Sequence, residues 1–178
     1  MVDVGQPMET CELCGKTDLR FHFEIVHKAS QEGMWIGSEC IKRFDIGVTV
    51  DGKEVTGRAA HQAVDRDRAA LIRQAEARSV INSLVVLSSL NPDFKELVEK
   101  FIGYYAQREK FTPKQMALLA WRFSEHGVPH NPRHFKVSLK RDREFDDLRA
   151  MEAWKADKLR PYLTRQQWDR LTAASNRR

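Results

Sequence analysis

The sequence has few cysteines, no long apolar run and no basic, apolar leader at its start. Only three of its 178 residues are cysteine. An odd number of thiols without a secretory leader argues against a disulfide framework and predicts a reducing, cytoplasmic setting. No segment approaches the roughly 18–20 apolar residues that a membrane span requires, so we expect no membrane partner. Metal binding is the natural interpretation of closely spaced thiols in such a protein.

Sequence motifs of common enzyme classes are also missing. There is no phosphate-binding G-x-x-x-x-G-K-[ST] motif and no nucleophile elbow. The acidic pairs Asp65/Asp67 and Asp146/Asp147 lie one or two residues apart on predicted helices, where such side chains do not face each other. We therefore expect a protein that is not an enzyme.

Proline and glycine are absent from residues 58–90, which predicts one long helix or two consecutive ones. Further helices are predicted at 92–107, at 113–126 behind a Thr112/Gln115 capping box, and at 142–159. Alternating apolar residues at 19–26 predict a strand with 34–37 as its partner, and Asp51-Gly52 predicts a tight hairpin turn. The fold class is α+β, predominantly α: a zinc-finger module with a following hairpin at 1–57, then a helical domain at 58–178 with a basic C-terminal region.

Cys11-Glu-Leu-Cys14-Gly15 is the strongest functional signal. Two thiolates separated by two residues can hold one tetrahedral ion from a tight turn, which the glycine permits. Cys40 follows Gly37-Ser38, where a strand can pass into a short helix whose N-terminus favours a thiolate. The predicted cofactor is one structural Zn²⁺ bound by Cys11, Cys14 and Cys40.

This arrangement resembles treble-clef-like zinc fingers, in particular the short C-x2-C-G…G-x-x-C modules of many uncharacterised phage and bacterial proteins. The resemblance covers residues 11–44 and implies a phage or mobile-element context. The usual treble clef supplies two cysteines from its helix, whereas only Cys40 is present here. His27 is the predicted fourth ligand, because twelve residues separate it from Cys14 and twelve more from Cys40. His22 is the competitor, although strand alternation places it opposite Phe21 and Phe23; Glu39 and water are further alternatives.

Basic residues are concentrated in the last quarter of the chain. From Arg133 to Arg178 there are 13 Lys/Arg against 7 Asp/Glu, while the first 132 residues have 17 against 18. Such an excess indicates a polyanionic partner, DNA more than RNA, or alternatively a solvated helix surface. In residues 133–143, basic side chains alternate with apolar ones that can pack inward. The predicted phosphate contacts are Arg133, Lys136, Lys140, Arg141 and Arg143.

Two other groups of residues have competing interpretations. His126, His130 and His134 recur every four residues, as metal ligands on one helical face do, but Pro129 and Pro132 interrupt that helix. We interpret them as loop histidines, with a second metal or nuclease site as the alternative. The four tryptophans are predicted to lie in the core.

Together these patterns predict a zinc-binding, non-enzymatic nucleic-acid-binding accessory or regulatory protein. A protein–protein interaction module with a structural zinc is the second hypothesis, and a metal-dependent nuclease is the third.

Overall fold

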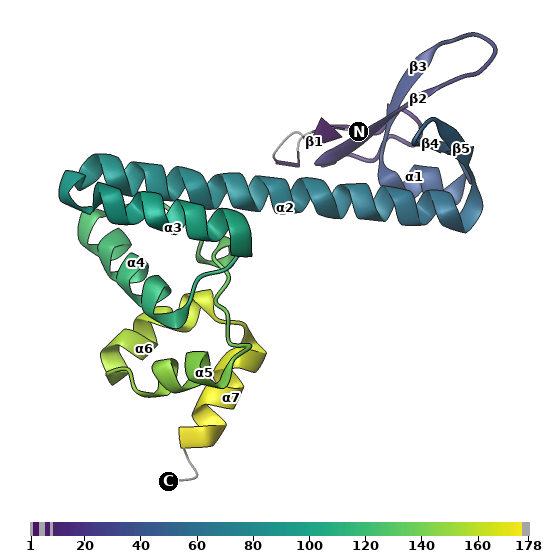
Figure 1. Cartoon of the computed structure of the whole chain (residues 1–178). Coiled ribbons are helices and arrows are strands. Elements are labelled where there is room, and N and C mark those ends of the chain that lie inside the picture. Colours follow the sequence, from purple (N-terminus) through teal and green to yellow (C-terminus); the bar gives the residue numbers. More distant parts are fainter. Residues whose placement is uncertain (1, 4–5, 8, 176–178) are drawn as a thin grey trace. The chain divides into compact units, whose positions relative to one another are not determined.

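A computed structural model describes residues 2–3, 6–7 and 9–175 of the chain. The chain divides into two compact units, Met1–Ala75 and Glu76–Arg178. The fold class is as predicted: short antiparallel strands come first and a multi-helix region follows (Figure 1). No helix within the described ranges is long and apolar enough to cross a membrane.

The first unit contains two small antiparallel sheets and two helices. Its elements are β1 (Val2–Asp3), β2 (Phe21–Val26), β3 (Gly33–Ile36), α1 (Ser38–Arg43), β4 (Val48–Val50), β5 (Lys53–Val55) and the first part of α2 (Gly57–Leu90). In the larger sheet β2 lies between β1 and β3 and pairs Phe23 with Ile36. The predicted turn at Asp51-Gly52 joins β4 to β5, and both residues have the positive φ that this tight turn requires.

The core of the first unit is small. Its buried residues are Cys11, Phe23, Ile36, Cys40, Ile41 and Val64. Val64 lies on α2, and neighbouring Asp65 binds the Lys42 ammonium at 2.9 Å. The start of α2 therefore packs with the strands, and the division between the two compact units falls inside this helix, between Ala75 and Glu76.

The second unit is helical. It contains the end of α2, α3 (Lys95–Arg108), α4 (Pro113–His126), α5 (Asp142–Arg149), α6 (Ala153–Leu159) and α7 (Arg165–Ser175), with short 3-10 turns at Pro92–Phe94, Pro132–His134 and Arg160–Tyr162. The predicted capping box of α4 is present: Gln115 N–H donates to Thr112 Oγ1, and Thr112 N–H donates to Gln115 Oε1. The single helix predicted at 142–159 is wrong, because the chain breaks after Arg149 and lets α5 and α6 both pack against α4.

Aromatic rings fill the core of the second unit. Phe111 stacks on Tyr105 and Phe135 with centroid distances of 5.2 and 6.0 Å, and Phe123 meets Phe135 edge-on at 5.3 Å. Phe111 also forms an isolated parallel bridge with Val137: its N–H donates to Lys136 O, and its C=O accepts from Ser138 N–H, both at 2.8 Å. This bridge ties the segment between α3 and α4 to the basic segment before α5.

We predict that Phe111→Ala lowers the free energy of unfolding by about 3–5 kcal/mol, since Phe111 is fully buried and the cavity would remain. Trp154→Ala, at a side chain that is 50% exposed, is the control and should cost less than about 1 kcal/mol. Urea unfolding followed by circular dichroism measures both values. Equal losses would show that Phe111 is not a central core residue.

Candidate metal centre

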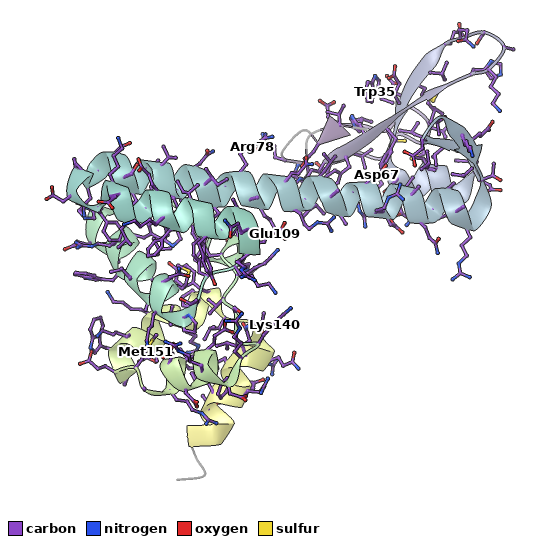
Figure 2. The ribbon with its side chains drawn as sticks, viewed as in Figure 1. Trp35, Asp67, Arg78, Glu109, Lys140 and Met151 are labelled. Carbon is purple, nitrogen blue, oxygen red and sulfur yellow. The ribbon has the colours of Figure 1, made fainter. Side chains whose placement is uncertain are left out.

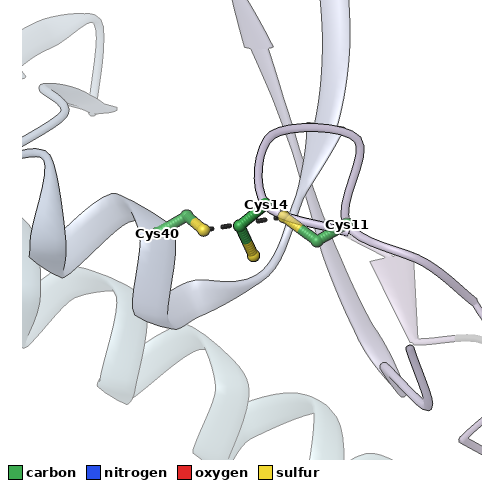
Figure 3. Close-up of side chains that lie close together, drawn as sticks. All are labelled: Cys11, Cys14 and Cys40. Carbon is green, nitrogen blue, oxygen red and sulfur yellow. Dashed lines mark hydrogen bonds between the residues drawn. The ribbon is translucent and has the colours of Figure 1, made fainter. Parts of the chain in front are cut away.

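The first two cysteines lie on a tight turn before the larger sheet. Gly15 N–H donates to Cys11 O at 2.8 Å, and Cys11 N–H donates to Lys16 O at 2.9 Å. Gly15 has a φ of 72°, a left-handed conformation that glycine adopts without strain. Figure 3 shows the side chains of Cys11 and Cys14 close together and near that of Cys40.

Cys40 comes from the third position of α1. Gly37 precedes this helix in an extended conformation, and its C=O accepts a bond from Cys40 N–H at 3.0 Å. Gly37 N–H also donates to Cys11 Sγ at 3.5 Å, so one residue connects both parts of the site. A Cβ atom at position 37 would lie only 3.0 Å from the Leu19 side chain, which explains why glycine suits this position.

The three sulfur atoms are spaced as a metal site requires. All three lie within 4.8 Å of one another, and Cys11 Sγ is 3.6 Å from Cys40 Sγ. Tetrahedral Zn–S bonds of about 2.3 Å place neighbouring sulfurs about 3.8 Å apart. The three cysteines are free, and 3.6 Å is far too long for a disulfide. The sulfurs therefore fit one tetrahedral cation.

Two of these thiols have opposite pKa shifts. Burial opposes ionisation of Cys11, but N–H groups of Gly37, Cys14 and Leu13 stabilise its thiolate and lower its pKa to about 7. Burial, together with the adjacent sulfurs of Cys14 and Cys11, raises the pKa of Cys40 to about 12. A divalent cation removes this conflict, because its charge stabilises all three thiolates together.

His27 does not join the three cysteines, so its prediction as fourth ligand is not supported. It follows β2 in the turn of the hairpin, where its exposed Nδ1 lies 3.0 Å from Ser30 Oγ. The cysteines lie near Phe23 and Ile36, at the opposite end of this hairpin. Four residues of strand separate Phe23 from His27, or about 13 Å. The equal spacing of His27 from Cys14 and Cys40 in the sequence was misleading, because the hairpin places His27 in its turn, far from the end near which the cysteines lie.

His22 does not complete the site either. Its ring is buried on the face of β2 opposite Phe23, 6.2 Å from the ring of Trp35. Among the described residues, no histidine or carboxylate joins the three cysteines as a fourth ligand. Three protein ligands leave the fourth position of a tetrahedral ion to water or to a donor from elsewhere.

The three spaced histidines are separated by the fold. The ring nitrogens of His126 and His134 lie near the side-chain amides of Asn91 and Asn131. His130 contacts the Val128 carbonyl through Nδ1 and Tyr162 Oη through Nε2, at 2.9 and 2.6 Å. Among the described residues, no cluster of three metal-binding side chains contains a histidine. The geometry thus supports the interpretation as separate histidines.

The five predicted phosphate ligands all lie at the surface. Arg133, Lys136, Lys140, Arg141 and Arg143 are exposed, whereas Phe135 and Val137 between them are buried as predicted. Lys136 is neutralised by Glu76, with 2.8 Å between Lys136 Nζ and Glu76 Oε2.

The prediction that all tryptophans are core residues is wrong for Trp121 and Trp154, which are 39% and 50% exposed.

Comparison of the chain with protein-family models, with curated proteins and with solved structures finds no match. The resemblance to treble-clef-like fingers therefore depends on Cys11–Gly15 and Gly37–Cys40 alone. The findings establish a cysteine cluster that can hold a metal ion such as zinc.

We predict that Cys40→Ser weakens zinc binding by at least about 100-fold, since the substitution removes one of three thiolates. His27→Ala is the matched control and should keep the affinity of the native protein, because His27 lies at the far end of the hairpin. Competition with a colorimetric chelator measures both affinities. An equal loss in His27→Ala would show that the histidine does bind the ion.

Proposed function

We propose that this chain is a non-enzymatic nucleic-acid-binding accessory protein whose first unit is stabilised by zinc. The observation that carries the proposal is the separation of side chains in residues 133–141: Phe135 and Val137 are buried and Leu139 is half-buried, whereas the Lys and Arg side chains are exposed. A surface of this kind binds the phosphate backbone by charge, which positions a nucleic acid without reading its sequence.

Zinc has a structural role in this proposal. The first unit has a small core to which Cys11 and Cys40 both belong, and small domains often need a metal to be stable. Bound zinc would link the Cys11–Gly15 turn to α1. The contacts of His130 with Tyr162 and Val128 use both nitrogens of its ring, which supports a structural role for it and a protein without nuclease activity.

We predict that the zinc-loaded protein binds DNA oligonucleotides with an affinity that falls steeply as salt rises. The logarithm of the association constant should fall by about 0.9 per phosphate contact on duplex and about 0.7 on single strands, for each tenfold rise in salt. Fluorescence anisotropy with DNA and RNA of equal length measures both slopes. Absence of binding at about 50 mM salt would exclude this function.

A groove on the second unit supports protein binding as the second candidate function. It has a volume of about 630 Å³ between α4 and the α5–α6 segment. Its apolar lining includes Leu118, Met151 and the exposed rings of Trp121 and Trp154. Met151, labelled in Figure 2, lies in the break between α5 and α6. Exposed tryptophans in an apolar groove are typical anchors for a protein partner.

We predict that peptides selected on the native protein from a random library bind this groove, and that Trp154→Ala weakens them at least about tenfold. Trp35→Ala changes a tryptophan of the first unit; it is the control and should leave the affinity of the peptides unchanged. Isothermal titration calorimetry measures the constants. If no selected peptide is sensitive to Trp154, the groove is not a docking site.

A further inference from the structure

We propose that nucleic-acid phosphates bind a basic track centred on Lys110, which the sequence pattern did not single out. We define the basic track as Arg108, Lys110, Arg133, Lys140, Arg141 and Arg170. The inference rests on the proposed function and identifies the surface that performs it. Three of the six residues, Arg108, Lys110 and Arg170, lie outside the basic segment that the sequence indicated.

The backbone brings these residues together through Phe111. α3 ends at Arg108, and Glu109 turns the chain with a left-handed φ of 53°. Phe111 is then fixed by its buried ring and by its two hydrogen bonds to Lys136 and Ser138. Lys110, the residue before this anchor, is consequently placed beside the segment that leads to Lys140. Glu109 and Lys140 mark the two segments in Figure 2.

Three surface cavities share Lys110, so the basic track is continuous. A cavity of about 450 Å³ places Lys110 with Arg108, Lys140 and Arg141. A second, of about 490 Å³, places it with Arg133. A third, of about 190 Å³, places it with Lys140 and Arg170. Because Lys110 lines all three, cations from distant parts of the sequence adjoin along one surface.

The cations of the basic track are available for a ligand. No carboxylate of the described residues lies within 4.0 Å of a charged nitrogen of these six side chains. Lys136 is excluded from the track because Glu76 pairs with it at 2.8 Å. The six cations around Lys110 therefore have no carboxylate partner at ion-pair distance among the described residues.

The one acidic residue that lines these cavities is Glu144, and its charge is already used. Its Oε2 accepts bonds from Ser138 Oγ and from the N–H groups of Lys140 and Arg141, at 2.9, 2.9 and 3.1 Å. Burial opposes its ionisation, but these donors outweigh burial and lower its pKa. Glu144 thus holds the segment of Lys140 and Arg141 in place.

The shape of the track indicates a nucleic-acid strand as the ligand. The six cations do not converge on one point, as they would around a single phosphate, but are distributed over adjoining cavities. A chain of phosphates matches such a distribution. Tyr104 and Gln107 line the cavity with Arg108, where a half-buried ring and an amide can contact a base or sugar.

The test compares two double variants of the full-length, zinc-loaded protein. Arg108→Ala/Lys110→Ala removes two cations of the track, one at the end of α3 and one just beyond it. The control, Lys95→Ala/Lys100→Ala, removes two exposed cations from the start and middle of α3. With a labelled oligonucleotide, the track variant should bind at least about tenfold more weakly and its salt slope should fall by about 1.4–1.8. The control should change affinity less than about threefold.

Other outcomes separate the inference from the proposed function. If the native protein binds DNA or RNA but both double variants lose equal affinity, the track is wrong and the function stands. If the native protein binds neither, the function fails. Binding to vesicles of phosphatidylserine and phosphatidylcholine without binding to nucleic acid would also overturn the inference. Lys110→Arg keeps the positive charge and should bind as the native protein does. A thermal melting curve of each variant checks that it is folded.

Discussion

The convergence of three sulfur atoms is the constraint on which the first unit depends. The Cys11–Gly15 turn and α1 come from separate parts of the chain, yet they place three thiols within 4.8 Å of one another. Few apolar residues surround them, and two of the thiols are part of the core itself. Without a cation, this site combines one easily ionised thiol with one that resists ionisation. A bound divalent ion would stabilise all three thiolates and would link the Cys11–Gly15 turn to α1.

The second unit depends on apolar packing instead, and its anchor is Phe111. This ring connects the aromatic core to the bridge with Val137. The same bridge arranges the charged surface, since it places Lys110, the neighbour of Phe111, beside the segment that leads from Val137 to Lys140. Core packing and the proposed phosphate contacts are therefore linked through one short pairing of two segments.

Local patterns predicted the fold well. The capping box at Thr112, the hairpin turn at Asp51-Gly52 and the uninterrupted helix α2 each depend on a few neighbouring residues. The break between α5 and α6 was missed, because packing against α4 decides it and no proline or glycine marks it.

The site was predicted in part. The spacing of Cys11 and Cys14 in one turn is a local property, and Gly37 signalled the start of the helix that contains Cys40. His27 was predicted from its equal spacing between Cys14 and Cys40, which ignores that it lies in the turn of the hairpin while the cysteines lie near the Phe23–Ile36 pair at the other end. Lys110 was missed since its position depends on the pairing of two segments more than twenty residues apart in sequence.

X-ray absorption at the zinc edge of the purified native protein tests the central claim most directly. The account predicts bound zinc with three sulfur neighbours at about 2.3 Å and one lighter neighbour. A protein without zinc, or zinc with fewer than three sulfur neighbours, would contradict it.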